Sequence, residues 1–465
     1  MPKTRAVAPG HCYGARVTEK ANSNVRWFLV LWLFVLSAVS YLDRVNISIA
    51  GDSIASEFHL TKVQLGSVFS AFLLGYALFQ TVGGWLADRL GSRRVLTAGV
   101  LWWGIFTALT AAISTKIAFA VLVFAVVRFL LGAGEAIIYP ASNQFVSRWI
   151  PSQERGIANG VIFAGVGFGA GVTPILITYI MIHRGWRWSF WMSALIGLVV
   201  GVVWYFAARD TPEEHPSVSS SELKLIQNGR TAGPAAGSES ATLSSKPADA
   251  KFAGVPWSII LSSKEVWAVT FSYFTFGYVA WMFFAWFFIY LNKVRGLDLK
   301  ASAFYTTLPF LAMAVCSPLG GAISDKLTKN YGKRIGRCSV AIFGLVLTTA
   351  FLIFGSQAHS ARLGSVVLAG GAGALYLSQS SFWSVTADIA GGSSGSVSGF
   401  MNMGNQFGGM FTAQLTPIIA LRWGWTASFA VAAILAILGA LSWLFVDPNC
   451  TLARPPASAV ERRKI

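Results

Sequence analysis

The chain has 465 residues, of which 54% are hydrophobic and 12% are charged, and its formal net charge is +17. This composition leaves too little polar surface for a soluble globular protein and is typical of a chain with several membrane-spanning helices. The positive charge does not indicate nucleic-acid binding, because the basic residues lie in short loops between apolar segments and not in a soluble basic domain.

Twelve apolar segments are long enough to span a bilayer, which takes about 20 helical residues. They cover residues 27–50, 63–86, 95–114, 117–140, 157–181, 188–207, 266–291, 301–323, 338–356, 364–389, 396–420 and 425–446. The sequence therefore predicts an all-α membrane protein with twelve transmembrane helices. Basic residues gather before the first segment, after the second, fourth and eighth segments, and at the end of the chain, so the positive-inside rule places both termini in the cytoplasm.

The first and fourth segments carry ionisable residues at membrane depth, where one charge costs about 2.5 to 3.5 kcal/mol on insertion scales. Asp43 and Arg44 lie about 100° apart around the first helix, and Arg128 and Glu135 lie two turns apart on one face of the fourth. We expect Asp43 to pair with Arg128, which leaves Arg44 for an anionic ligand and Glu135 as a candidate for protonation. A purely structural network of ion pairs is the alternative.

A Gly-Asp-Arg-Gly-Arg pattern follows the second segment, and a related stretch at 321–327 follows the eighth. The pattern consists of Gly84, Asp88, Arg89, Gly91 and Arg93. Thr-Pro pairs at 173–174 and 416–417 also fall at matching places, so the two halves of the chain are predicted to be a duplication. An ordinary basic loop is the alternative interpretation of the pattern alone.

Residues 209–264 interrupt the apolar pattern, because most of this stretch is rich in Ser, Ala, Gly and Pro. Such a stretch cannot bury enough apolar surface to offset its chain entropy, so we predict a mobile cytoplasmic linker, with a short interfacial helix near 256–266. The predicted organisation is a cytoplasmic tail (1–26), a six-helix bundle (27–208), the linker (209–264), a second six-helix bundle (265–447) and a cytoplasmic tail (448–465).

The loop pattern at 84–94 resembles the signature loop of the major facilitator superfamily. This resemblance implies a fold of two six-helix repeats, with a substrate site near the bilayer midplane between them. It also implies that Gly84, Asp88, Arg89, Gly91 and Arg93 act in gating and not in substrate binding.

A narrower resemblance rests on four further stretches, at 41–46, 128–141, 185–190 and 210–216. Together they resemble the anion:cation symporter family, which includes bacterial permeases for galactonate, glucarate and hexuronates, sialin and the vesicular glutamate transporters. The resemblance covers residues 25–447. It implies that Asp43 and Glu135 carry the coupled protons and that Arg128 tunes them.

The same resemblance implies a set of side chains that contact the substrate. Arg44 is expected to bind the substrate carboxylate, and the other members of the set are Tyr41, Tyr76, Ser380, Trp383 and Asn402. The second half has no central acid or base except Asp388, so we expect the proton coupling to reside in the first half.

Two stretches depart from the sugar-acid members of the family. Residues 165–170 in the fifth segment lack a polar side chain, and the second asparagine in 401–409 of the eleventh segment is displaced by one position. A less hydroxylated or aromatic carboxylate is therefore an alternative substrate.

An enzyme is not expected, because the five histidines form no cluster and the four cysteines lack metal-ligand spacing. We predict a monomeric, multi-pass transporter of the plasma (inner) membrane, without a cofactor or metal. It is predicted to import an organic anion, a sugar acid such as a hexonate, hexarate or hexuronate, together with protons. An exchanger or exporter of another monocarboxylate, such as an aromatic acid, is the alternative.

Overall fold

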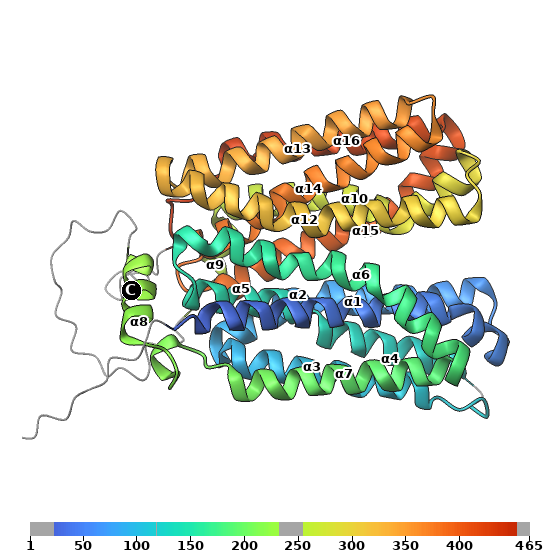
Figure 1. Ribbon diagram of the computed structural model, residues 1–465, viewed down its shortest axis with the longest axis horizontal. Coiled ribbons are helices and arrows are strands. Elements are labelled where there is room, and N and C mark those ends of the chain that lie inside the picture. Colours follow the sequence, from blue (N-terminus) through green and yellow to red (C-terminus); the bar gives the residue numbers. More distant parts are fainter. Residues whose placement is uncertain (1–22, 118, 232–253, 453–465) are drawn as a thin grey trace, which may run out of the picture.

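Long helices run side by side in two groups (Figure 1). The structure is a computed structural model that describes residues 23–117, 119–231 and 254–452. The first group comprises α1 (Val25–Phe58), α2 (Lys62–Leu90), α3 (Ser92–Ala112), α4 (Ala120–Glu135) with α5 (Ile138–Trp149), α6 (Arg155–Arg184) and α7 (Trp186–Ala207). The second group comprises α10 (Lys264–Ala285), α12 (Leu299–Tyr331), α13 (Lys333–Gln357), α14 (Ala361–Ile389), α15 (Ser394–Trp423) and α16 (Trp425–Ser442).

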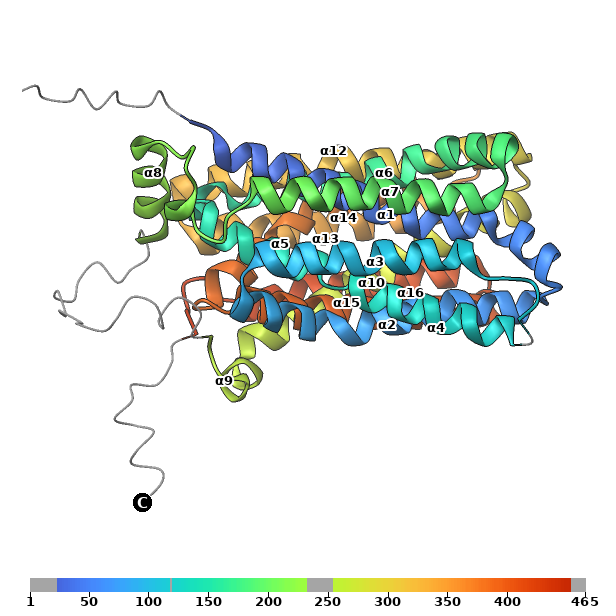
Figure 2. The same cartoon turned by 90° about the horizontal axis from the view of Figure 1, so that it is seen from below.

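Short helices connect or extend these long ones. They are η1 (Ser152–Glu154), η2 (Pro212–Glu214), α8 (Ser220–Thr231), α9 (Trp257–Ser262), α11 (Phe287–Ile289), the π-helical segment η3 (Tyr290–Val294) and η4 (Trp443–Phe445). Within the described residues, 11 helical segments are long and apolar enough to cross a membrane. The helix α15 is equally long, at 30 residues, and lies alongside them (Figure 2), but polar residues such as Asn402, Asn405 and Gln406 reduce its hydropathy.

The fourth spanning segment is broken between α4 and α5. Pro140 has no backbone N–H to donate to the carbonyl of Ala136, and its ring crowds the preceding turn. The helix is interrupted at Ala136 and Ile137 and resumes at once, so Glu135 is the last residue before the break.

The two groups approach each other most closely at glycines that occupy matching places in the two halves. A Cβ atom added to Gly84 of α2 would lie 1.9 Å from the carbonyl oxygen of Gly395 in α15. A Cβ atom added to Gly321 of α12 would lie 2.2 Å from the carbonyl oxygen of Gly156 in α6. Small residues allow such backbone contact between membrane helices, so no other residue fits at these crossings without a shift.

The linker begins with more structure than the sequence predicts. The helix α8 packs at the end of the bundle where α1 begins (Figures 1 and 2), with Ile226 fully buried. The Glu222 carboxylate accepts hydrogen bonds from the backbone N–H groups of Val25 (3.2 Å) and Arg26 (3.1 Å), which α1 cannot satisfy by itself. This capping contact explains why a polar segment is held against the bundle.

The rest of the predicted linker is only partly described. Residues 232–253 of the predicted mobile segment lie outside the described residues. The predicted interfacial helix near 256–266 corresponds in position to the short helix α9. Of the two predicted tails, residues 1–22 and 453–465 also lie outside the described part of the chain.

Candidate functional site

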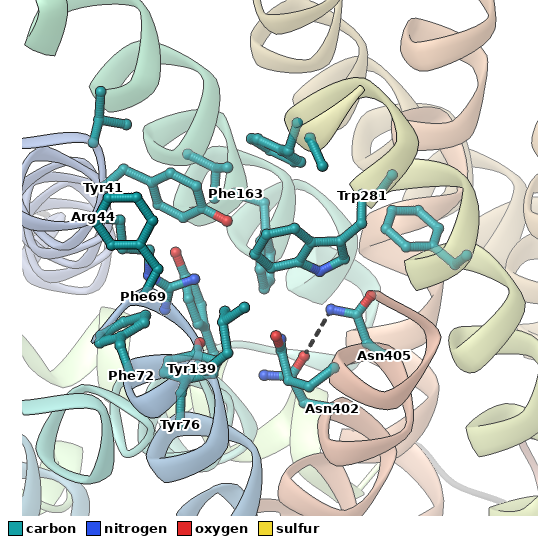
Figure 3. A pocket seen from close by; sticks show the side chains of 18 of the residues that line it. Tyr41, Arg44, Phe69, Phe72, Tyr76, Tyr139, Phe163, Trp281, Asn402 and Asn405 are labelled. Atoms are coloured by element: carbon teal, nitrogen blue, oxygen red, sulfur yellow. Dashed lines mark hydrogen bonds between the residues drawn. The ribbon is translucent and has the colours of Figure 1, made fainter. Parts of the chain in front are cut away.

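A cavity of about 460 Å³ lies between the two groups of helices (Figure 3). Of the 24 residues that line it, 11 are aromatic and none is acidic. The aromatic residues are Tyr41, Phe69, Phe72, Tyr76, Tyr139, Phe163, Tyr273, Phe276, Trp281, Phe284 and Tyr376. The chain as a whole is 14% aromatic, so these rings are strongly concentrated around the cavity.

Arg44 lies in the cavity wall and is bonded to an acid behind it. Its Nε donates to Oε1 of Glu135 at 2.5 Å, and its guanidinium carbon lies 4.0 Å from the ring centre of Tyr76 and 4.8 Å from that of Tyr41. Glu135 is 1% exposed and does not line the cavity. Among the residues that the structure describes, Nη2 of Arg44 has no hydrogen-bond partner.

The predicted pairing of Asp43 with Arg128 is wrong, and Arg44, which was expected to be left for an anionic ligand, is bonded to Glu135. Asp43 faces α3, where it accepts a hydrogen bond from Oγ1 of Thr107 at 3.3 Å, and its Oδ1 has no partner among the described residues. The guanidinium of Arg128 lies 4.7 Å from the ring centre of Phe72. The side chain of Arg44 lies between the cavity and the end of α4, so its guanidinium group bonds to Glu135 while it also lines the cavity.

The predicted substrate residues divide into two sets. Tyr41, Arg44, Tyr76 and Asn402 line the cavity, whereas Ser380 and Trp383 do not. On α14 the cavity face is formed by Tyr376 and Gln379, and position 380 lies about 100° away from 379 around that helix. Nε1 of Trp383 instead donates to the hydroxyl of Tyr273 at 2.9 Å, so Trp383 supports a ring that does line the cavity.

Several cavity residues were missed by the sequence analysis, notably Tyr139, Tyr273, Gln379, Trp281 and Asn405. A signal for the two amides exists, because Gln379 follows Tyr376 and Asn405 follows Asn402 at the spacing of one helical turn. Figure 3 shows Arg44 and the tyrosines of the first half on one side of the cavity, with Trp281, Asn402 and Asn405 on the other.

Asp88 of the loop pattern joins the two halves at the end of the bundle where α1 begins. Its carboxylate accepts hydrogen bonds from the backbone N–H of Gly395 (2.9 Å), the N–H of Ser396 (2.7 Å) and Oγ of Ser396 (2.6 Å). These groups form the N-terminus of α15, where unpaired N–H groups and the helix dipole favour a negative charge.

The second half repeats this contact in the opposite direction. Asp325 of α12 accepts hydrogen bonds from the N–H groups of Gly156 (2.9 Å) and Ile157 (2.7 Å) at the N-terminus of α6. Arg337 pairs with Asp325 at 2.6 Å, and its Nη2 donates to the carbonyl of Ser152 at 2.6 Å. We call the Asp88 and Asp325 contacts together the cross-bundle gate.

A second buried ion pair belongs to the same region. Nη1 of Arg155 lies 2.7 Å from Oδ1 of Asp388, whose side chain is 0% exposed, and Lys333 lies 3.3 Å from the same oxygen. The single acid that the sequence analysis found in the second half therefore belongs to the cross-bundle contacts and not to the cavity.

The other residues of the loop pattern have different positions. Gly84 lies at the crossing with Gly395, whereas the guanidinium of Arg89 packs on Trp85 of its own helix, 4.4 Å from the ring centre. Gly91 has a φ of 88°, a left-handed conformation that glycine tolerates. The Asp210 carboxylate lies beside Gly91 and accepts a hydrogen bond from the backbone N–H of Arg93 at 2.8 Å. Burial raises the pKa of the Asp210 carboxyl, and the hydrogen bond from Arg93 opposes that shift.

The comparisons with known proteins agree with this geometry. A family model described as Major Facilitator Superfamily matches residues 33–413 and 329–464. This chain belongs to that superfamily. The fold agrees with that of the proton:xylose symporter XylE bound to 6-bromo-6-deoxy-D-glucose, at a TM-score of 0.71 and 14% sequence identity, covering 93% of this chain and 98% of XylE. The predicted all-α fold of two six-helix repeats is thereby confirmed.

Several relatives of known name are anion transporters. The chain is 34% identical to the probable sulfoacetate transporter SauU of Cupriavidus necator over 446 residues, covering 96% of this chain and 99% of SauU. It is 30% identical to the probable galactarate/D-glucarate transporter GudP of Escherichia coli over 450 residues, covering 92% of this chain and 95% of GudP. The chain is therefore a multi-pass membrane transporter of the major facilitator type, and these named relatives transport anions.

Proposed function

We propose that this protein imports an organic anion together with protons by alternating access between its two halves. The observation that carries this proposal is the position of Arg44, which lines the cavity and is at the same time bonded to the buried Glu135. Arginine binds carboxylates through a planar pair of donors, so Arg44 is the natural partner of an entering anion.

The coupling follows from competition for one guanidinium. An anion that binds Arg44 from the cavity takes the cation away from Glu135, and a buried carboxylate without a counter-ion favours its protonated form. Anion and proton then assist each other's binding, because the coupling between two sites is reciprocal. Asp43, held by one hydroxyl of Thr107, is the second proposed proton carrier.

Alternating access requires that the cavity opens at one end while the other end is closed. The cavity wall extends along α1 from Tyr41 to Ser48, away from the end where Asp88 and Asp325 join the halves. We interpret this arrangement as the state closed toward the cytoplasm. In this proposal both termini are cytoplasmic, the membrane is the plasma membrane and the transporter works as a monomer.

The substrate class predicted from the motifs is a sugar acid, and the name of GudP supports it. The name of SauU supports a small acid without a sugar chain. An exchanger or exporter is the second candidate. Strict exchange requires no titratable acid beside the cavity, whereas the buried Glu135 is bonded to Arg44 of the cavity wall.

The test uses purified protein and a panel of sugar acids, aromatic acids and amino acids. An anion that binds only the folded state raises the melting temperature, and the best ligand is then followed into proteoliposomes. We expect accumulation driven by an inward proton gradient. The variants Asp43→Asn and Glu135→Gln should each abolish it, whereas Asp52→Asn, which alters an exposed acid of the same helix, should not.

The double variant Asp43→Asn, Glu135→Gln decides between symport and exchange. Accumulation by this variant at the wild-type level would refute proton coupling. Uptake by the wild type that appears only with substrate preloaded in the vesicles, and that ignores the proton gradient, would establish the exchanger.

A further inference from the structure

One face of α2 runs from the cavity to the cross-bundle gate. Tyr76 lines the cavity, and Gln80, Gly84 and Asp88 follow it at intervals of four residues, the spacing at which helical side chains share a face. Gly84 and Asp88 belong to the contacts with α15 that join the halves at this end. Gln80 therefore lies between the cavity and the gate, on the side of α2 that faces the second half.

A buried pair of amides joins the two halves at this level. Nδ2 of Asn402 in α15 donates to Oε1 of Gln80 at 2.9 Å, and the two residues are 3% and 0% exposed. A Cβ atom added to Gly399 of α15 would lie 2.5 Å from the carbonyl oxygen of Gln80, so the two helices touch through their backbones here. Because the amides belong to different halves, their hydrogen bond exists only while the halves are joined at this end.

Asn402 belongs to the cavity wall as well as to this contact. Its Oδ1 accepts a hydrogen bond from Nδ2 of Asn405 at 3.4 Å (Figure 3), so its amide is held at the nitrogen by Gln80 and at the oxygen by its own helix. Other hydrogen bonds between the halves, such as that of Asn143 with Thr386, join residues that do not line the cavity. Asn402 is thus a residue through which closure of the gate affects the shape of the cavity.

The matching crossing between α6 and α12 is built without such a pair. Its closely packed glycines are Gly156 and Gly321. Seven residues after Gly156 lies Phe163, and four residues before Gly321 lies Ser317, and these are the places of the two amides in the repeat. Oγ of Ser317 is buried without a partner among the described residues. Burial of two amides costs desolvation that an apolar pair avoids, so the fold does not require the amide pair.

We propose that Gln80 is a positioning residue for the anion site. It fixes the amide of Asn402 in the cavity wall while the Asp88 end is closed, and it releases this amide when the halves separate. A side-chain amide has two N–H donors and two acceptor lone pairs, so Asn402 can bond to a ligand and to Gln80 at the same time. An anion that contacts Asn402 then binds more tightly to the closed state, and by reciprocity it favours closure. This inference rests on the proposed function, since it assumes that the transported anion contacts Asn402.

The first test needs no ligand. With the four native cysteines replaced, a Thr386→Cys reporter measures opening at this end, because Thr386 is fully buried and α14 carries neither amide. Gln80→Met keeps the length of the side chain and removes its acceptor, so labelling should be about fivefold faster, the effect of one hydrogen bond. Gln414→Met makes the same change at an exposed position of α15 and should label at the wild-type rate.

A double-variant cycle separates the hydrogen bond from general packing. Asn402→Leu should accelerate labelling by a similar factor, and the double variant Gln80→Met, Asn402→Leu by no more than either single one, because each removes the same bond. Two factors that multiply in the double variant would mean that the amides act independently, and they would overturn the inference. If Gln80→Met does not fold, Gln80→Asn takes its place, since it keeps the amide but is one methylene too short to reach Asn402.

The second test adds an acid in detergent, without a proton gradient. The probes are D-galactonate, D-glucuronate, D-glucarate, benzoate and sulfoacetate, one for each class of acid considered above. An acid that raises the melting temperature of the wild type should also slow labelling of the Thr386→Cys reporter. Gln80→Met should reduce this slowing, whereas Gln414→Met should keep it in full. A merely structural role of Gln80 would leave the slowing by the acid unchanged.

The outcomes distinguish this inference from the proposed function. If one acid raises the melting temperature but does not slow labelling, or slows it equally in Gln80→Met, the positioning role is wrong, while proton-driven uptake of that acid would still support the proposed function. If none of the five acids raises the melting temperature, the proposed function fails and the inference fails with it.

Discussion

Replacing Asp88 with asparagine should weaken the cross-bundle gate without touching the cavity. Asp88 is 3% exposed and accepts three hydrogen bonds from Gly395 and Ser396. Its charge lies at the C-terminal end of its own helix, where the dipole is unfavourable, so the N-terminus of α15 is what stabilises it. This stabilisation exists only while the two halves are joined at this end.

The expected size of the effect follows from these contacts. An asparagine keeps one acceptor oxygen and turns an NH₂ group toward donors, so at least one of the three bonds is lost and the others lose their charge-assisted character. Hydrogen bonds to charged groups contribute about 1.5 to 3 kcal/mol against about 0.5 to 1.5 for neutral ones, so we estimate a loss of about 2 kcal/mol from the closed state. That loss shifts the ratio of closed to open protein by roughly thirtyfold.

Thiol labelling measures this shift directly. Thr386 is fully buried beneath the gate, where its Oγ1 accepts a hydrogen bond from Asn143 at 2.9 Å. With the four native cysteines replaced, a Thr386→Cys reporter should be labelled much faster in the Asp88→Asn protein, and transport should slow because the closed state must form again in each cycle. Asp52→Asn is the control. Wild-type labelling and wild-type transport in Asp88→Asn would mean that the pattern is an ordinary basic loop.

Three further predictions concern the cavity, the linker and the glycine crossing. Arg44→Lys keeps the charge but loses the planar pair of donors, so ligand affinity should fall at least tenfold in calorimetry while the protein still folds; unchanged affinity would contradict the assignment. Glu222→Gln weakens the cap on α1, so the melting temperature should fall, whereas Glu213→Gln, another acid of the linker, should have a smaller effect. Gly84→Leu should prevent closure at the crossing with Gly395 and abolish transport. The check is an uptake assay on protein whose folding is verified by fluorescence-detected size-exclusion chromatography.

The sequence was sufficient to predict features that have a periodic or repeated signature. The twelve apolar segments and the matching stretches at 84–94 and 321–327 predict the two-repeat fold, because bilayer thickness and duplication both leave a regular pattern in the chain. The cavity residues Tyr41, Arg44, Tyr76 and Asn402 were found through the family resemblance.

The misplaced features depend on distances between helices. Ser380 lies next to Gln379 in sequence, yet only Gln379 faces the cavity, because the rotation of α14 about its axis is fixed by packing and not by composition. The partner of Glu135 could not be deduced for the same reason: an arginine side chain is long enough to reach either acid, and the choice depends on the direction of α1. The helix α8 was missed because its stability comes from Glu222 and Ile226 meeting the bundle, and not from its own composition.

The two halves use one backbone design for two different electrostatic purposes. In both, an aspartate at the end of one helix binds the N-terminus of a helix in the other half, at a crossing that requires glycine. Asp325 is paired with the buried Arg337, and Arg337 also donates to Ser152, so this contact links three segments. Asp88 is held chiefly by backbone N–H groups and one hydroxyl. Because Asp325 and Arg337 belong to the same half, their ion pair persists when the halves separate, and the contacts that break are the hydrogen bonds to Gly156, Ile157 and Ser152.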